Sequence, residues 1–218
     1  MTNLSPVNLI ILLSVLALLP FMLMMVTSYV KIVVVFSLMR NALGVQQVPP
    51  TMVLNGLAMV LTVFIMAPVG LETWELIEQS GNVEQSVADP AKLGPLLETA
   101  SPPLRAFLEK NTDAQTLAAL KHSAQRIWPE RYHAILEENG PLLLLPAFVL
   151  TELTEAFRIG FLLYLPFVII DLIISNILLA MGMMMVSPMT ISLPFKLLLF
   201  VTLDGWLKIS QGLMYGYG

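Results

Sequence analysis

No charged side chain interrupts residues 41–71, whose sequence is NALGVQQVPPTMVLNGLAMVLTVFIMAPVGL. A helix needs about 20 consecutive apolar residues to cross the hydrocarbon core of a bilayer, so this run is long enough to span a membrane. Residues 1–30 are also free of charge. Together the two runs predict a hydrophobic helical hairpin over residues 1–71.

The connector between these runs carries Lys31 and Arg40 but no acid, and it ends in Pro49 and Pro50. Basic residues favour the cytoplasmic side of a membrane, and the paired prolines favour a turn. We therefore expect a short cytoplasmic turn and an external N-terminus. Because no basic residue precedes Lys31, we expect no cleaved signal peptide.

The composition also indicates a membrane protein. Of the 218 residues, 57% are hydrophobic and 12% are charged, whereas soluble domains have roughly 45–50% apolar and about 25% charged residues. A net charge of −4 offers no basic surface for nucleic acid. With no cysteine and two histidines, the chain is poorly equipped for a metal centre, so we expect no metal and no cofactor.

Residues 72–140 form a polar insert, because they hold 11 of the 15 acids, 6 of the 11 bases and both histidines. The expected hairpin topology places this insert outside the cytoplasm, which in a double-membrane bacterium is the periplasm.

Residues typical of helix ends divide the insert into three predicted helices. The first begins with Ser101 as N-cap, the second follows Asp113 and ends before Pro129, and the third ends at Gly140. Residues 81–95 are expected to form a loop. The expected buried side chains are Leu104, Phe107 and Leu108 on the first helix, and Leu117, Leu120 and Ile127 on the second.

From residue 141 onward the chain is apolar again, with scattered charges and prolines. The prolines are Pro146, Pro166, Pro188 and Pro194. Each removes a backbone donor and favours a kink or break, which is tolerated where neighbouring protein satisfies the freed carbonyl. The sequence thus predicts an all-α membrane protein with two hydrophobic helical hairpins (1–71 and 141–218), whose kinked helices flank a small helical periplasmic insert (72–140).

Glu152, Glu155 and Arg158 recur every three residues, so on a helix they share one side, with Glu155 and Arg158 close enough to pair. Two interpretations remain open. The charges belong to a solvated helix end, or they contact another subunit, because ionisable groups near hydrocarbon turn toward protein or water.

Asp171 lies inside an apolar run, where an unpaired carboxylate costs about 2.5–3.5 kcal/mol on the insertion scale. Lys196 is the only base between residues 159 and 207. The two therefore form the expected buried pair, within one chain or between neighbouring copies. The pair has either a structural role or a role in a proton relay, in which case Glu152 could take part as well.

Met183, Met184 and Met185 follow Gly182 and precede Pro188 by two residues. Methionine is unbranched and flexible, so it fills irregular gaps and adapts to changing partners. Such side chains either fill gaps in an apolar helix or, contributed by several copies, form a compliant seal that deforms around an unfolded chain.

The sequence carries no phosphate-binding GxxxxGK[ST], no GxSxG, no HExxH and no dinucleotide-binding fingerprint. Ser187 and Thr190 have no histidine nearby that could serve as a base. We therefore expect no catalytic residues and no enzymatic activity.

Six motifs in the two hydrophobic parts resemble the FliP/SctR family, export-gate subunits of the flagellar and type III secretion apparatus. They are residues 40–50 (RNALGVQQVPP), 146–148 (PAF), 156–161 (AFRIGF), 165–171 (LPFVIID), 181–196 (MGMMMVSPMTISLPFK) and 204–206 (DGW). Flagellar members have a proline pair where this chain has Ser187-Pro188, so the resemblance favours the virulence-type SctR branch.

The resemblance implies a homopentamer that assembles with SctS-like and SctT-like subunits at the bacterial inner membrane and projects into the periplasm. It implies that unfolded secreted proteins pass through this gate, and that Met183, Met184 and Met185 close it as a gasket. Glu152, Asp171 and Lys196 match charged positions of the family. The alternative is a proton- or ion-coupled transporter subunit that uses Asp171 and Lys196.

Overall fold

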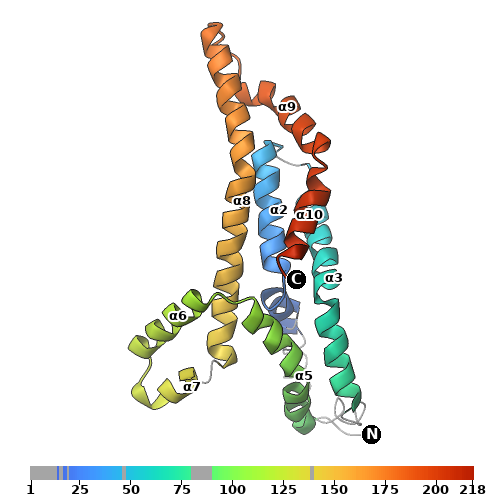
Figure 1. Cartoon of the computed structure of the whole chain (residues 1–218), viewed down its shortest axis with the longest axis vertical. Coiled ribbons are helices and arrows are strands. Elements are labelled where there is room, and N and C mark those ends of the chain that lie inside the picture. The colour runs from blue at the N-terminus through green and yellow to red at the C-terminus, as the bar shows by residue number, and fades with distance from the viewer. Residues whose placement is uncertain (1–13, 15–16, 19, 46–47, 80–89, 138–139) are drawn as a thin grey trace.

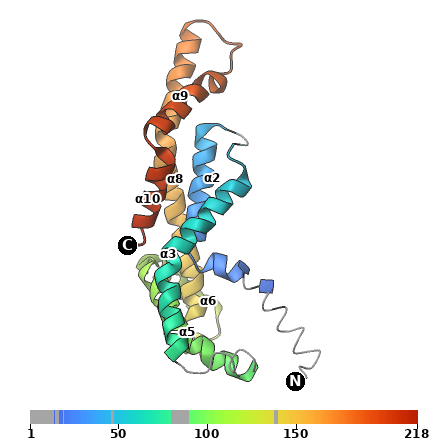
Figure 2. The same cartoon turned by 90° about the vertical axis from the view of Figure 1, so that its right-hand side faces the viewer.

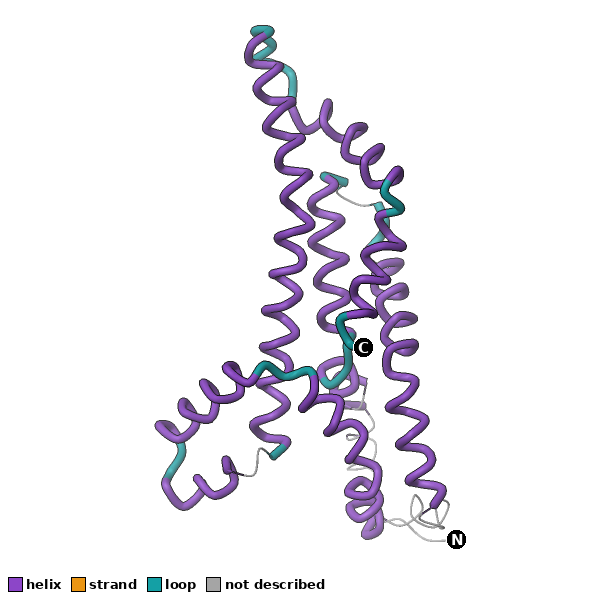
Figure 3. Tube along the Cα trace, in the orientation of Figure 1, coloured by secondary structure: helices purple, strands orange, loops and turns teal. Residues whose placement is uncertain are grey.

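The computed structural model describes residues 14, 17–18, 20–45, 48–79, 90–137 and 140–218. Within these residues it contains helices, turns and short connections but no strand, as expected (Figures 1 and 3). The helices are α2 (Tyr29–Leu43), α3 (Thr51–Gln79), α5 (Pro90–Lys110), α6 (Ala114–Ile127), η1 (Glu130–Tyr132), α7 (His133–Glu137), α8 (Pro141–Ala180), α9 (Pro188–Thr202) and α10 (Gly205–Tyr215). The all-α architecture predicted from composition is confirmed.

Helix α8 runs almost the whole length of the molecule, and α2 packs along its middle (Figure 1). The two helices approach closely at Gly160, where an added Cβ would lie 2.3 Å from Cδ1 of Leu38. Apolar residues from α2, α3, α8 and α10 meet around this contact. The buried members of that cluster are Ile32, Val35, Phe36, Leu54, Ala58, Ala156 and Leu213.

The turn between α2 and α3 lies farther along the chain than the charges suggested. Lys31 and Arg40, expected in a turn, both belong to α2. The helix ends at Gly44, whose left-handed φ of 75° suits glycine and lets its N–H bond to the Asn41 carbonyl. The prediction of a turn from residue 31 is therefore wrong, because Lys31 is paired inside the protein and does not mark a solvent-exposed connection.

The insert follows the predicted order but not all the predicted ends. Helix α5 already includes residues 90–95, expected as loop, and continues through Ser101, whose hydroxyl donates to the Glu98 carbonyl at 3.0 Å. Ser101 thus bonds back to its own helix and is no N-cap. The rest of the expected loop, residues 81–89, and Asn139 lie outside the described residues.

Helix α6 begins with Asp113 as N-cap and ends at the Trp128-Pro129 break, as predicted. Its expected buried face is not buried, however, and Ile127 is 78% exposed. Gly140 is the N-cap of α8, with φ −64°, and does not have the left-handed conformation of a helix C-cap. On α5 the expected face is confirmed, since Leu108 is buried and Leu104 and Phe107 pack beside it against α8.

The prolines of the C-terminal part do not end helices. Helix α8 continues through Pro146 and Pro166, α9 continues through Pro194, and Pro188 opens α9 at a position that needs no intrahelical N–H. After the loop that follows α8, the chain turns back as α9 and α10, which are bent by 58° relative to each other (Figure 2). The bend falls at Asp204, which has a positive φ of 51°.

Among the described residues, α3 and α8 are each long and apolar enough to cross a membrane, and the bent α9–α10 pair would add a third span if it crosses as one. Much of their apolar surface is exposed in the single chain. On the outer side of α8 this surface includes Phe157, Phe161, Leu162, Ile169, Leu172 and Ile173.

Candidate functional site: two charge clusters and a methionine loop

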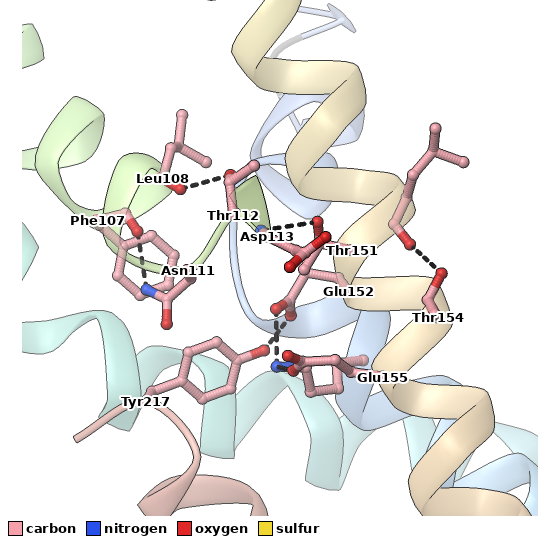
Figure 4. Close-up of polar contacts among 12 residues, drawn as sticks. Phe107, Leu108, Asn111, Thr112, Asp113, Thr151, Glu152, Thr154, Glu155 and Tyr217 are labelled. Carbon is pink, nitrogen blue, oxygen red and sulfur yellow. Dashed lines mark hydrogen bonds and ion pairs between the residues drawn. The ribbon is translucent and has the colours of Figure 1, made fainter. Parts of the chain in front are cut away.

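The first cluster surrounds Lys31, a cation buried inside the helical part of the molecule. Its Nζ lies 2.8 Å from Oε1 of Glu152 and 2.6 Å from Oε2 of Glu155, one helical turn apart on α8. Lys31 and Glu152 are almost fully buried, whereas Glu155 is half exposed. One cation thus holds two carboxylates and joins α2 to α8. Figure 4 labels both carboxylates, which project from α8.

Tyr217 closes this cluster from the C-terminal end of the chain (Figure 4). Its hydroxyl donates to Oε2 of Glu152, and the Lys31 ammonium lies 4.2 Å from the ring centroid, within cation–π range. The same ring stacks on Phe107 of α5, with centroids 5.8 Å apart. Burial, followed by the negative charge of Glu152, raises the pKa of the Tyr217 hydroxyl, which stays protonated as a donor.

A second set of bonds ties the insert to α8 close to the same place. The backbone N–H of Asp113 donates to Oγ1 of Thr151 at 3.1 Å, and the Thr151 hydroxyl donates to the Ala147 carbonyl. The Asp113 carboxylate accepts from the backbone N–H and hydroxyl of Thr116, which caps α6 and lowers the pKa of Asp113. These bonds and Tyr217 fix the insert on the helical part.

Arg158 does not form the ion pair with Glu155 that the three-residue spacing suggested. Glu155 pairs with Lys31, while Arg158 is exposed and forms no ion pair with any described residue. The expected Glu155–Arg158 pair is therefore wrong, because the buried Lys31 lies within reach of both carboxylates. Of the three charges, Glu152 and Glu155 are brought together and Arg158 is left at the surface.

The second cluster contains Asp171 and Lys196, which the structure brings together within one chain. Lys196 Nζ lies 2.6 Å from Oδ2 of Asp171 and donates to the Ala42 carbonyl at 3.3 Å. The Ser192 hydroxyl donates to Oδ1 of Asp171 at 2.6 Å. Lys196 thus places its positive charge near the C-terminal end of α2, where a helix dipole favours cations, and joins α2, α8 and α9.

The methionine loop, residues 181–187, begins at a helix end of the Schellman type. Gly182 has a left-handed φ of 72°, and its N–H bonds to the Leu179 carbonyl, while the Met183 N–H bonds to the Leu178 carbonyl. The chain then leaves α8 at the end of the molecule farthest from the insert (Figure 1). There the side chains of Met183, Met184 and Met185 are 48%, 81% and 100% exposed.

Sequence reasoning missed two members of these clusters. Lys31 is the only charged residue among residues 1–39, and a lone charge in an apolar run needs a partner, the same argument that paired Asp171 with Lys196. The sequence therefore indicates a buried partner for Lys31, whereas the turn prediction places this residue in a connector. Tyr217 carried no such signal, because its importance arises from where α10 returns the chain end.

Comparison with known proteins agrees with the architecture. The FliP family matches residues 12–213 of this chain. The chain is 53% identical to Yop proteins translocation protein R of Yersinia pestis over 212 residues, which cover 97% of this chain and 96% of that protein. It is 51% identical to hypersensitivity response secretion protein HrcR of Ralstonia nicotianae over the full length of both, and 49% identical to virulence protein YscR of Salmonella typhimurium over 95% of each.

These matches extend through both hydrophobic parts, the insert between them and the methionine loop. The resemblance drawn from the six motifs is thereby confirmed. This chain belongs to the FliP family.

Proposed function

We propose that this chain is a core subunit of a virulence-type type III secretion export apparatus, and that several copies form a protein-conducting gate closed by their methionine loops. The relatives named for translocation and secretion support the setting. The proposal includes a homopentamer, SctS-like and SctT-like partners, unfolded secreted proteins as cargo, and an inner-membrane complex that projects into the periplasm. No covalent chemistry is needed.

The exposure of the methionine loop is the observation that carries this proposal. Met185 has no contact that covers its side chain, and Met184 is nearly as open. Three adjacent flexible, apolar side chains at the tip of a long helix are costly to leave in water, since burying one is worth about 1.5–3 kcal/mol. Side chains of neighbouring copies at a common axis would cover them and exclude water and ions.

The apolar faces of α3, α8 and α9 support assembly in the same way. Either a membrane or neighbouring copies would cover these apolar faces. At the tip of α8, the conformational freedom of the exposed methionines suits packing against neighbouring copies. The two charge clusters are internal to each copy. In this proposal they hold α2, α8 and α9 as one rigid unit, so that the loop emerges at a fixed place.

The alternative is an ion-coupled transporter in which Asp171 and Lys196 relay protons. Both groups are already occupied, Asp171 by Lys196 and Ser192, and Lys196 also by the end of α2. These contacts support a structural role. Transport that collapses with Asp171→Asn in a fully assembled complex would instead favour the relay.

The gasket is tested by replacing Met183, Met184 and Met185 with alanine and measuring small-ion conductance of the assembled complex in planar bilayers. We expect a clear rise in conductance without loss of assembly, because alanine cannot fill the axis. Met52→Ala is the matched control, since Met52 is 86% exposed on α3 but lies outside the loop. Unchanged conductance in the triple variant would contradict a gasket.

A further inference from the structure

The methionine loop is also the place where thioether side chains of this chain lie open to solvent side by side. Met185 is fully exposed, Met184 nearly so and Met183 about half, and every residue from 181 to 185 is exposed. An added Cβ at Gly182 would meet no atom within 4 Å, so no described residue beyond its chain neighbours packs over this glycine. A reagent in water therefore reaches three adjacent methionines at one site of the single chain.

The sequence around the loop makes it sensitive to a change in polarity. Residues 172–195 contain no Asp, Glu, Lys or Arg. The charged residues on either side of this run, Asp171 and Lys196, are paired with each other at 2.6 Å. The loop is thus flanked by apolar and uncharged residues, among which a strong new dipole would stand out.

Oxidation of methionine supplies such a dipole. When hydrogen peroxide reacts with a thioether, a sulfur lone pair attacks one peroxide oxygen, the S–O bond forms and the O–O bond breaks. The proton of the transferred oxygen passes to the other oxygen, which leaves as water, and sulfur gives up the electron pair that peroxide gains. The product is methionine sulfoxide, a polar and chiral side chain in place of a flexible apolar one.

We propose that Met183, Met184 and Met185 form an oxidation site, and that their conversion to sulfoxides by a peroxide opens the seal and makes the gate sensitive to oxidants. This inference rests on the proposed function, because an effect on the gate requires that loops of several copies close it. The oxidation itself requires only the exposure of these side chains in the chain.

A seal made of methionines depends on apolar contacts between adaptable side chains. A sulfoxide oxygen accepts hydrogen bonds, and burying it among apolar groups without a donor is unfavourable. Water therefore enters the seal with the new oxygens, and small ions follow. Hydrogen peroxide is uncharged and close to water in size, so it reaches the methionines that face either mouth of a closed ring.

The test compares the assembled wild-type complex with a variant in which Met183, Met184 and Met185 are all replaced by leucine, an apolar residue of similar volume that peroxide does not oxidise. Both complexes are treated with hydrogen peroxide in planar bilayers, and small-ion conductance after treatment is divided by conductance before it. We expect this ratio to be about tenfold for the wild type, which corresponds to about 1.4 kcal/mol of lost sealing free energy. Peroxide should not change the conductance of the leucine variant.

Mass spectrometry of peptides from the same samples locates the added oxygen. The loop methionines should be oxidised, whereas Met39, which is buried on α2, should stay unmodified. Met52→Leu is the matched control, because it removes an exposed methionine of α3 outside the loop and should respond to peroxide like the wild type. During the wild-type reaction, conductance should follow the sulfoxide content of the loop and not that of Met52, which decides the question even if the leucine variant leaks before treatment.

The outcomes separate this oxidation site from the proposed gate. Sulfoxides in the loop with unchanged wild-type conductance would overturn the inference and leave the gate standing, and so would loop methionines that peroxide does not modify. An equal rise in the wild type and the leucine variant would place the reactive group elsewhere and would also overturn it. Failure to find a complex of several copies would instead overturn the proposed function.

Discussion

At the scale of single residues, Lys31 is the charge on which the packing of α2 against α8 depends. It forms ion pairs with the fully buried Glu152 and the half-exposed Glu155 at once. Removing one partner of a buried pair costs much more than removing an exposed partner, because the remaining charge stays desolvated.

Lys31→Ala is therefore expected to lower the free energy of unfolding by about 3–5 kcal/mol. Glu155→Gln, which leaves the Lys31–Glu152 pair intact, should cost about 1 kcal/mol or less. Thermal or denaturant unfolding of the full-length protein in mild detergent, followed by tryptophan fluorescence, compares them. Equal losses in the two variants would contradict a central role for the buried pair.

Tyr217→Phe removes the hydroxyl that donates to Glu152 but keeps the ring that stacks on Phe107. Hydrogen bonds to charged groups contribute about 1.5–3 kcal/mol, so we expect a loss of unfolding free energy in that range. Tyr215→Phe is the matched control, because Tyr215 is 79% exposed and should tolerate the change. A silent Tyr217→Phe would show that the ring alone fixes the chain end.

At the scale of helices, close packing of α2 on α8 depends on the missing side chain of Gly160. Gly160→Val should force Leu38 and the α2 backbone away, at a cost of about 1–3 kcal/mol from overpacking. Gly56→Val on α3, where no atom lies within 4 Å of an added Cβ, should change stability much less. Rescue of Gly160→Val by Leu38→Ala would confirm the contact, and its failure would place the defect elsewhere.

The cap of α6 gives a pH-dependent prediction. The pKa of Asp113 is lowered in the folded protein, so its stabilisation is present above the ordinary value of 3.8 and is lost as pH falls through the lower, folded pKa. Asp113→Asn keeps a cap that does not titrate. The wild type should therefore lose more α6 helicity in acid than Asp113→Asn, measured by circular dichroism. Equal losses of helicity in the wild type and in Asp113→Asn would show that protonation of the Asp113 carboxylate is not the cause.

The helices differ in how far the sequence predicts them. The uncharged run over residues 41–71 and the Asp113 cap reflect local chemistry, so most of α3 and both ends of α6 were predicted. Ser101 and Pro146 resemble helix boundaries locally, but bonding within α5 and packing of α8 override them. Lys31 was misplaced because its partners lie more than a hundred residues away, a contact that no local pattern contains.

At the scale of the whole molecule, one chain leaves its most flexible apolar side chains and much of its helical surface uncovered. Lys31, Glu152 and Lys196 are buried and paired within the chain, so these three charges are not available to link copies in this conformation. In the proposed assembly, contacts between copies would instead use the exposed apolar helix faces and the methionine loop. The proposed gate depends on these surfaces being covered in the assembly.

The most direct test is a native mass measurement of the full-length protein extracted in mild detergent with its co-purifying partners. We predict a complex containing several copies of this chain, five if the ring implied by the family resemblance forms. A single stable copy surrounded by detergent or lipid, with the methionine loop in contact with acyl chains, would contradict the account.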